Sequence, residues 1–308
     1  MNKIKIDAHK EFGINLNHDL YGFAEKTEFV PEIDKNHVFD ALTTQAILLG
    51  LVHNKRVLVH GPHGTGKSTH IEQIAARLNW DCIRINLDGQ LNRQDLIGRD
   101  AIVLSDGKQI TEFKQGLLPF ALQRPCILVL DEYDAGRPEI MFVIQRLLED
   151  NGKLTLLEQN KIIYPHPDFR IFATSNTVGT GDITGLYHGT NHINQGQMDR
   201  WSFTVSLDYL PAEIEADIIH AKSPHLHNPN GRETIKQIVN LANMIRSAFH
   251  ADEITSIISL RALINWADNI ALFDDIQTAF CISYLNRCDI QDRAKIAEFY
   301  QRCFGVDL

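Results

Sequence analysis

The chain has 308 residues, of which 44% are hydrophobic and 22% charged, a composition typical of a globular protein with room for two domains. Its formal net charge of −9, from 30 basic and 39 acidic residues, argues against an extended nucleic-acid surface. No stretch reaches the roughly 18 apolar residues of a membrane-spanning helix, and the N-terminus lacks a signal-peptide core. Five cysteines without a C-x-x-C pair indicate reduced thiols, so a cytoplasmic protein is expected.

The first 30 residues are predicted to form an N-terminal arm, mostly loop, with one short edge strand at 3–7. A helix is then expected at 40–52, because apolar residues recur there at helical spacing. It leads into a short apolar strand at 56–60, and a second amphipathic helix follows at 69–78. The segment between this strand and this helix carries the strongest motif of the chain.

That segment is Gly61-Pro62-His63-Gly64-Thr65-Gly66-Lys67-Ser68, which matches G-x-x-x-x-G-K-[ST] at every fixed position. Glycines let backbone N–H groups turn toward a phosphate, the lysine reaches the β- and γ-phosphates, and the serine hydroxyl can bind Mg²⁺. A strand, a glycine-rich loop and a helix N-terminus together form an anion site. We therefore predict that Gly61 to Thr69 bind a nucleoside triphosphate. A flexible surface turn would leave the lysine and the flanking elements unexplained.

Strands and helices continue to alternate downstream, which is typical of a parallel α/β sheet. Strands are predicted at 82–87, 126–130, 169–174 and 203–207, and helices at 116–123 and 138–151. Two β-hairpins are also expected, one at 101–113 that turns at Asp106-Gly107 and one at 154–164 that turns near 158–160.

The character of the sequence changes at Pro211, where helical patterns replace the strands. Helices are predicted at 211–221, 232–250, 259–272 and 275–303, the last broken near Asp289, which can cap a final helix ending at Gly305. We therefore predict an α/β nucleotide-binding domain at 31–210 and a small all-α domain at 211–308.

Polar residues follow the apolar strands of this sheet, where open α/β sheets bind their ligands. Asp131 and Glu132 come after the strand at 126–130. Asp131 is placed to hold Mg²⁺, directly or through water, and Glu132 to activate the attacking water. Asn176 follows the next apolar strand and can polarise the same water. Taken singly, the two carboxylates could be surface groups that begin a turn, and Asn176 could be a turn-forming asparagine.

Two arginines are candidates for stabilising the charge that accumulates on the γ-phosphate during transfer. Arg200 precedes the last predicted strand, and the sequence leaves open whether it reaches its own site or a neighbour's. Arg261 opens a helix of the all-α domain, from which it could close that domain over the nucleotide. Alone, Arg261 would more often be a solvated arginine.

The order of these motifs resembles the AAA+ ATPases of the MoxR and magnesium-chelatase branch, including the two hairpins before the Asp-Glu and Asn strands. Over roughly residues 12–270, four strings are very similar to the ATPase subunits of aerobic cobaltochelatases: 63–73, 131–138, Gly185-Leu186-Tyr187-His188-Gly189-Thr190 and 195–201. This resemblance implies a three-layer AAA+ domain with a helical lid.

The same resemblance implies roles and partners. Lys67 and Ser68 would be the phosphate-loop pair and Asn176 the first sensor, with Asp131 and Glu132 as the metal-holding and catalytic carboxylates. Arg200 would be a finger that reaches a neighbouring subunit, and Arg261 the second sensor. ATP and Mg²⁺ would be the cofactors of a ring, expected to be hexameric. The partners would be a subunit with a metal-binding von Willebrand-type domain and a large subunit that inserts Co²⁺ into hydrogenobyrinic acid diamide.

Three functional classes follow from the sequence. The leading hypothesis is a motor subunit that couples ATP hydrolysis to cobalt insertion in cobalamin biosynthesis. The alternative is a MoxR-like chaperone that remodels another metalloprotein or a von Willebrand-type partner. A DNA-unwinding ring is disfavoured by the acidic balance and because the hairpin at 101–113 carries only Lys108 as a basic residue. The exposed hairpin tips are expected to contact the partner or the pore.

Overall fold

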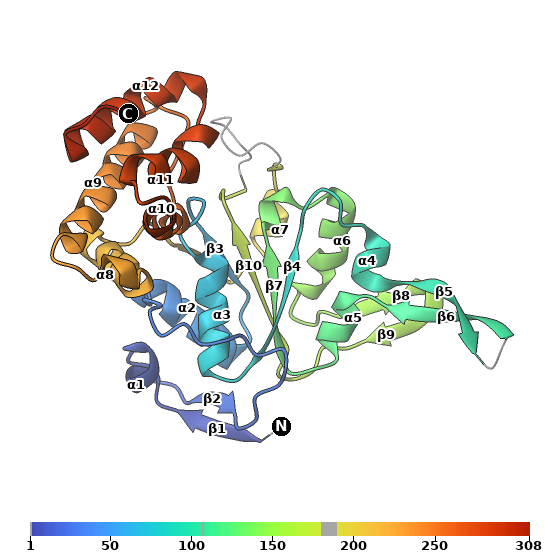
Figure 1. Cartoon of the computed structure of the whole chain (residues 1–308). Coiled ribbons are helices and arrows are strands. Elements are labelled where there is room, and N and C mark those ends of the chain that lie inside the picture. The colour runs from blue at the N-terminus through green and yellow to red at the C-terminus, as the bar shows by residue number, and fades with distance from the viewer. Residues whose placement is uncertain (1, 106–107, 180–189) are drawn as a thin grey trace. The chain divides into compact units, whose positions relative to one another are not determined.

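The computed structural model describes residues 2–105, 108–179 and 190–308 (Figure 1). It divides into two compact units, one formed by Met1–Pro62 and Gly66–Leu207 and the other by His63–Thr65 and Asp208–Leu308. The turn expected at Asp106-Gly107 and the residues Gly185 to Gly189 lie outside the described residues.

A five-stranded sheet, in the strand order β11-β3-β10-β7-β4, is the centre of the first unit. Every strand pair in it is parallel, which confirms the predicted fold class. Strand β7 is buried at all of its positions, and burial on both faces explains its unbroken apolar run. The strands are β3 (Val57–His60), β4 (Asp81–Asn86), β7 (Cys126–Asp131), β10 (Arg170–Ser175) and β11 (Phe203–Ser206).

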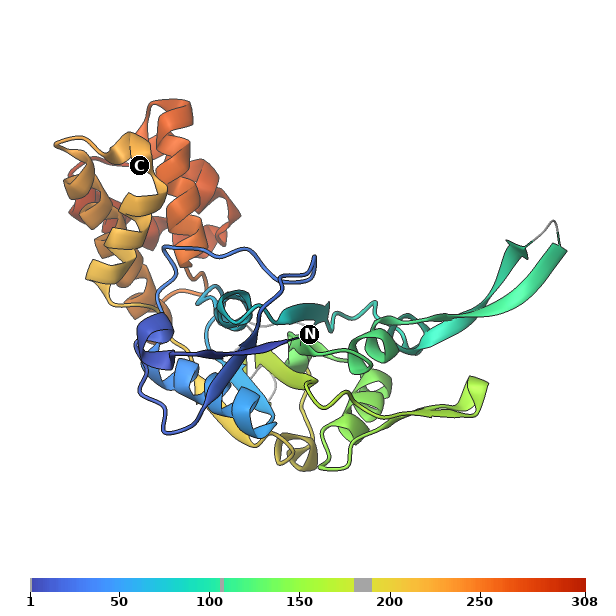
Figure 2. The ribbon, with the colours of Figure 1, turned by 90° about the horizontal axis from the view of Figure 1, so that it is seen from below.

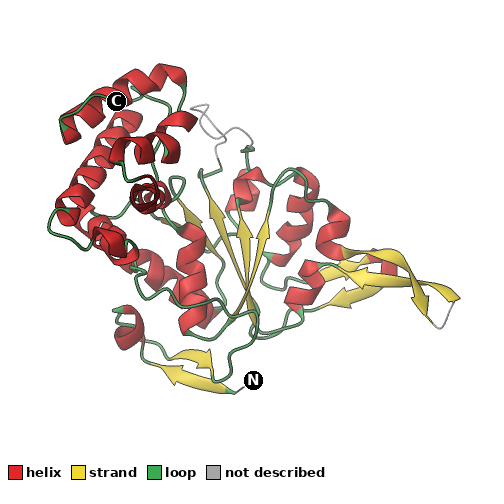
Figure 3. Ribbon diagram, in the orientation of Figure 1, coloured by secondary structure: helices red, strands yellow, loops and turns green. Residues whose placement is uncertain are grey.

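Helices cover both faces of this sheet and make three layers (Figure 3). Alternate residues of β7 point to opposite faces: Ile127 and Val129 join a core with helices α2 (Ala41–His53) and α3 (Lys67–Arg77). Leu128 and Leu130 join a second core on the other face. Each such side chain stabilises the fold by roughly 1.5–3 kcal/mol through burial. The helices of the second core are α4 (Arg93–Ile97), α5 (Leu117–Leu122) and α6 (Pro138–Leu147).

The N-terminal arm contains more regular structure than the sequence predicts. The expected edge strand is present as β1 (Lys3–Ile6), but it pairs antiparallel with β2 (Leu20–Phe23), in a stretch expected to be loop. A short helix, α1 (Ala8–Phe12), lies between them and is capped by the side chain of Asp7. The glycines and asparagines of this arm favour loop locally, but burial of its apolar side chains in the α2–α3 core outweighs that preference.

Both predicted hairpins are present, and they extend away from the sheet (Figure 2). The first consists of β5 (Gly98–Ser105) and β6 (Lys108–Gln115), and the second of β8 (Leu154–Leu156) and β9 (Lys161–Ile163). The first hairpin is longer than expected, because the turn signal locates its tip but not its ends. It therefore includes Arg99 and Lys114 besides Lys108, and the expectation of a single basic residue is wrong.

The second unit is helical from Ala212 onward, apart from its connecting loops. The expected break in the last helical pattern is confirmed, since the Asp289 side chain accepts a hydrogen bond from the Gln291 N–H at the start of the final helix, and Gly305 caps the end of that helix. Among the described residues, none of the helices combines the length and apolar character needed to cross a membrane. The main helices are α8 (Ala212–Lys222), α9 (Gly231–His250), α10 (Leu260–Phe273), α11 (Ile276–Ser283) and α12 (Ile290–Phe304).

Candidate functional site

Three neighbouring strands of the sheet end in the predicted site residues. Strand β10 lies between β3 and β7, so the segments that follow these three strands emerge side by side at one edge. They are the loop after β3, Glu132 after β7 and Asn176 after β10. The carboxyl edge of a parallel sheet is where such folds bind ligands.

Two glycines of the loop have conformations that other residues adopt only with strain. Gly61 has φ 152°, and a Cβ atom there would lie 2.0 Å from the carbonyl oxygen of Leu207. Gly66 has φ 86° and is the N-cap of α3. The glycines thus allow the chain to turn sharply from β3 into α3, whose N-terminus carries the partial positive charge of the helix dipole.

Lys67 is the first residue of α3, and its side chain turns back over the loop. Its Nζ donates to the carbonyl oxygens of Gly61 at 2.8 Å and Pro62 at 2.9 Å, and to Asn176 Oδ1 at 2.9 Å. The residue is only 8% exposed. Burial lowers the pKa of Lys67 to about 8, although the carboxylates of Asp134, Asp131 and Glu132 oppose that change.

Asp131 is surrounded by hydrogen-bond donors. Its Oδ1 accepts from the hydroxyls of Ser68 and Thr174, and its Oδ2 accepts from Nε and Nη2 of Arg84. Burial would raise the pKa of Asp131, but the bonds from Ser68, Thr174 and Arg84 lower it below its ordinary value. The carboxylate is therefore ionised at neutral pH, and it accepts a hydrogen bond from the serine hydroxyl.

Glu132 has an unusual backbone conformation, with φ 54° and ψ 48°, in the left-handed region. For a glutamate, such a conformation costs of order 1–3 kcal/mol and occurs most often at functional sites. The Glu132 N–H donates to Thr174 Oγ1 at 3.3 Å, which fixes the start of the turn after β7. The side chain is partly exposed, so it is accessible to water.

A buried carboxylate that the sequence analysis did not single out holds Asn176 in place. Asp134 is fully buried, and its Oδ2 accepts from the backbone N–H groups of Asn176 at 3.0 Å and Thr177 at 2.8 Å. The Thr177 hydroxyl donates to the same oxygen at 2.9 Å. These bonds fix the backbone of Asn176, whose side chain meets Lys67. The signal in the sequence was a third acidic residue two positions after Glu132.

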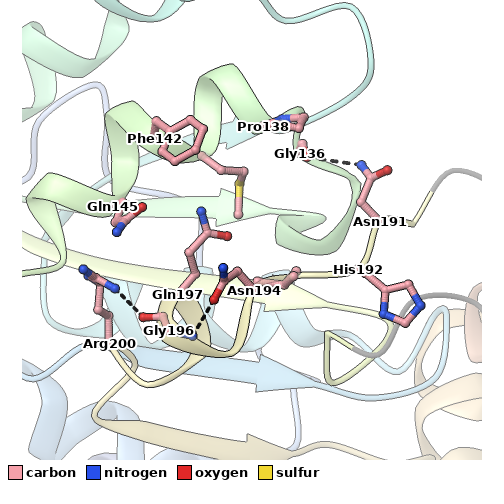
Figure 4. A pocket seen from close by; sticks show the side chains of 12 residues that line it. Gly136, Pro138, Phe142, Gln145, Asn191, His192, Asn194, Gly196, Gln197 and Arg200 are labelled. Atoms are coloured by element: carbon pink, nitrogen blue, oxygen red, sulfur yellow. Dashed lines mark hydrogen bonds between the residues drawn. The ribbon is translucent and has the colours of Figure 1, made fainter.

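Arg200 lies in the first unit, but its contacts are away from the loop after β3. Its Nη1 donates to the carbonyl oxygen of Gly196 in the short helix α7 (Gln195–Met198), and its Nη2 lies 3.7 Å from Glu149 Oε1. It lines a cavity of about 290 Å³ between α6 and α7 (Figure 4). None of these contacts is with the loop after β3, so the structure groups Lys67, Asp131 and Asn176 together but not Arg200.

Arg261 and the tip of the loop belong to the second unit. Arg261 is exposed in the first turn of α10, whose N-cap is Ser259: the Ser259 hydroxyl accepts from the Ala262 N–H at 3.3 Å. His63, Gly64 and Thr65 group with this unit, whereas Gly66 and the residues of α3 group with the first. The predicted role of Arg261 stays a prediction.

The chain is similar to known proteins over most of its length. Residues 56–186 match a family described as "AAA domain (dynein-related subfamily)", and residues 215–292 match "CbbQ/NirQ/NorQ C-terminal". The protein named "Aerobic cobaltochelatase subunit CobS" from Sinorhizobium sp is 53% identical over 303 residues, which cover 98% of this chain and 91% of that protein. Midasin from Dictyostelium discoideum is 30% identical over 163 residues, 53% of this chain and 3% of midasin.

Among solved structures, the RuvB Holliday junction branch migration motor of Thermotoga maritima has a TM-score of 0.52 and 14% identity, over 91% of this chain and 76% of that chain. At this identity the likeness concerns the fold alone. The match to an AAA domain implies nucleotide binding. The resemblance seen in the sequence motifs is thereby confirmed.

Proposed function

The chain belongs to the CobS family of aerobic cobaltochelatase subunits, and we propose that it uses ATP hydrolysis to drive cobalt insertion in cobalamin biosynthesis. The observation that carries the ATPase part is the meeting of Lys67, Ser68, Asp131 and Asn176 at adjacent strand ends. A phosphate-binding loop, an ionised carboxylate and a polar sensor at one sheet edge are the parts that phosphoryl transfer needs.

The residues fit ATP with Mg²⁺. The loop from Gly61 to Thr69 would hold the phosphates through backbone N–H groups, with Lys67 neutralising the β- and γ-phosphates. The Ser68 hydroxyl and the Asp131 carboxylate, directly or through water, would supply the oxygen ligands that Mg²⁺ prefers. Mg²⁺ held there would neutralise charge that develops on the phosphate oxygens.

Glu132 is the proposed base. It follows the metal-holding carboxylate directly and is partly exposed, so it can accept a proton from the attacking water. Its left-handed backbone is held by the bond to Thr174, which favours one fixed direction for the side chain. Asn176 would orient the water or the γ-phosphate, since its amide is already bonded to Lys67.

Two arginines would complete the site from elsewhere. Arg200 contacts Gly196 in α7 and Glu149 just after α6 rather than the loop after β3, which favours action on a neighbouring subunit's nucleotide. Arg261 would act as a sensor on the helical lid. Action in trans requires assembly, so we propose a closed ring, expected to be a hexamer.

The name of the relative implies further subunits, because CobS is one subunit of its enzyme. We propose a von Willebrand-type subunit and a large cobalt-inserting subunit as partners. Five free cysteines are compatible with work in the reducing cytoplasm.

Reconstitution tests this proposal. The chain is mixed with the candidate partner subunits, ATP, Mg²⁺, Co²⁺ and hydrogenobyrinic acid diamide, and cobalt insertion is followed by absorbance. Insertion should require ATP and should be lost with Glu132→Gln, which keeps the side chain's size but removes the base. ATP hydrolysis without cobalt insertion in the complete mixture would favour the chaperone function instead.

A further inference from the structure

The acceptor positions of Asp131 are all occupied. An ionised carboxylate offers about four lone-pair sites, and four donors contact Asp131: two hydroxyls at Oδ1 and two guanidinium nitrogens at Oδ2. The bond from Arg84 Nε is 2.8 Å long. A cation can therefore approach this carboxylate only if one of the donors turns away.

The donors differ in how readily they give way to a cation. The hydroxyls of Ser68 and Thr174 can rotate their hydrogens and present lone pairs to a metal ion. A guanidinium has no lone pair to offer and carries a positive charge, so Arg84 competes with a cation instead of joining its ligands. The Arg84 side chain is 45% exposed whereas that of Asp131 is 7% exposed, so Arg84 has room to move.

A second acceptor for Arg84 is already in place. Glu72, on α3, lies with its Oε1 3.4 Å from Arg84 Nη1, on the opposite end of the guanidinium from the Asp131 contact. Its side chain is 28% exposed. If Arg84 leaves Asp131, the Glu72 carboxylate can still pair with the guanidinium and keep its positive charge near the site. Arg84 therefore need not return fully to solvent.

We propose that Arg84 is a resident counter-ion of Asp131 that competes with a divalent cation, and that Glu72 receives Arg84 when the cation displaces it. This inference rests on the proposed Mg²⁺–nucleotide site and adds a positioning pair to it. Arg84 thereby raises the Mg²⁺ concentration that tight nucleotide binding requires. Glu72 lowers that concentration, because it stabilises the displaced position of Arg84.

The experiment measures the affinity of the purified chain for a fluorescent ATP analogue as Mg²⁺ is titrated. Arg84→Met removes the competing charge at similar length, so the half-saturating Mg²⁺ concentration should fall roughly fivefold. Arg84→Lys keeps the charge without the planar fork and should give an intermediate value, and it replaces the first variant if that one does not fold. Glu72→Gln should raise the concentration roughly twofold, but should have no effect in the Arg84→Met background.

Arg232→Met is the matched control, since it breaks an exposed arginine–carboxylate pair with Asp217 in the helical unit and should change nothing. An unchanged or higher Mg²⁺ requirement in Arg84→Met would overturn the inference, because Arg84 would then orient Asp131 for the cation rather than compete with it. If the unaltered chain binds no nucleotide even with Mg²⁺, the proposed function itself fails, which is a distinct result.

Discussion

At the scale of residues, the site depends on charges that are buried close together. Lys67 lies among three carboxylates, yet burial still lowers its pKa to about 8. Asp131 has the opposite balance, because hydrogen bonds overcome the effect of burial and keep its pKa low. Asp131 stays ionised, whereas Lys67 loses its proton above about pH 8. The net charge of the site should therefore change at alkaline pH.

The pH dependence of nucleotide affinity follows from Lys67. A bound phosphate favours the charged lysine and raises its pKa in the complex. Below about pH 8 the lysine is charged in both states, so this group leaves the affinity constant. Above it, binding must take up a proton, and the affinity should fall toward tenfold per pH unit.

This prediction is checked with a fluorescent nucleotide between about pH 7 and pH 9.5, and with calorimetry in buffers of different ionisation enthalpy to count protons. Lys67→Met should bind more weakly and without the alkaline slope. A constant affinity of the unaltered chain over the whole range would show that Lys67 is not the group that titrates.

A second residue-scale prediction concerns Asp134. Asp134→Asn weakens three hydrogen bonds to one buried oxygen and leaves buried groups imperfectly paired, so the free energy of unfolding should fall by about 2 kcal/mol. Thr177→Val removes one of the three donors to Asp134, together with the acceptor of a long bond from the Gly179 N–H, and should cost about 1 kcal/mol. Denaturant unfolding measures the loss of stability in both variants.

The turnover of ATP should fall more in Asp134→Asn than in Thr177→Val, because the backbone of Asn176 is released. Equal losses of turnover in the two variants would count against a role of Asp134 in holding Asn176.

At the scale of elements, the sequence predicts the frame of the site well and its internal contacts poorly. Asp131, Glu132 and Asn176 could be identified because each follows an apolar strand, and the order of strands in parallel folds brings such ends together. Arg84 and Thr174 lie within strands, so their roles depend on which strands are neighbours. Arg84 pairs with Val129 of β7, two residues before Asp131, and this strand pairing brings the Arg84 side chain within reach of Asp131.

The first hairpin, β5 and β6, forms a two-stranded sheet of its own and does not pair with the five-stranded sheet. Ile102 is 74% exposed and Leu104 is 77% exposed, and both occupy one face of β5 together with the partly buried Phe113 across the ladder. Apolar side chains on a projecting ribbon are more typical of a contact surface than of a solvated loop. We therefore infer that the outer half of the hairpin contacts another subunit.

Shortening this hairpin tests the inference. Replacing residues 102–111 by Asn-Gly joins the paired residues Ala101 and Glu112 through a two-residue turn and keeps Phe113 in place. Basal ATP hydrolysis should stay within about twofold of the unaltered chain, since no site residue changes. Cobalt insertion with the partner subunits should be lost. A protein that no longer folds, seen by circular dichroism, would show instead that the hairpin is structural.

At the scale of the whole molecule, the position of Arg200 bears on the proposal that the chain works with copies of itself. Its contacts are with Gly196 and Glu149, and they place it at the cavity between α6 and α7 instead of at its own phosphate loop (Figure 4). If Arg200 serves a neighbour, each complete site combines Glu132 of one subunit with Arg200 of the next. Hydrolysis would then depend on assembly, because each site would be incomplete without the neighbouring subunit.

Mixing two inactive variants separates action in trans from action in cis. Arg200→Ala alone should abolish hydrolysis, with nucleotide binding retained, because the arginine acts on charge that develops during transfer. Glu132→Gln alone should do the same. In an equal mixture, an Arg200→Ala subunit that faces a Glu132→Gln neighbour has both groups intact at its site, and random assembly makes about a quarter of the interfaces of this kind.

Turnover of the mixture should therefore recover to at most about a quarter of that of the unaltered protein. The control is Lys67→Met mixed with Glu132→Gln. It should recover nothing, because both changes fall on the nucleotide-binding side of the interface, so each site still lacks either the lysine or the base. Recovery in the first mixture but not in the second would require that Arg200 crosses a subunit boundary. If neither mixture recovers although subunits exchange, Arg200 acts within its own chain, and its contacts with Gly196 and Glu149 must open before hydrolysis.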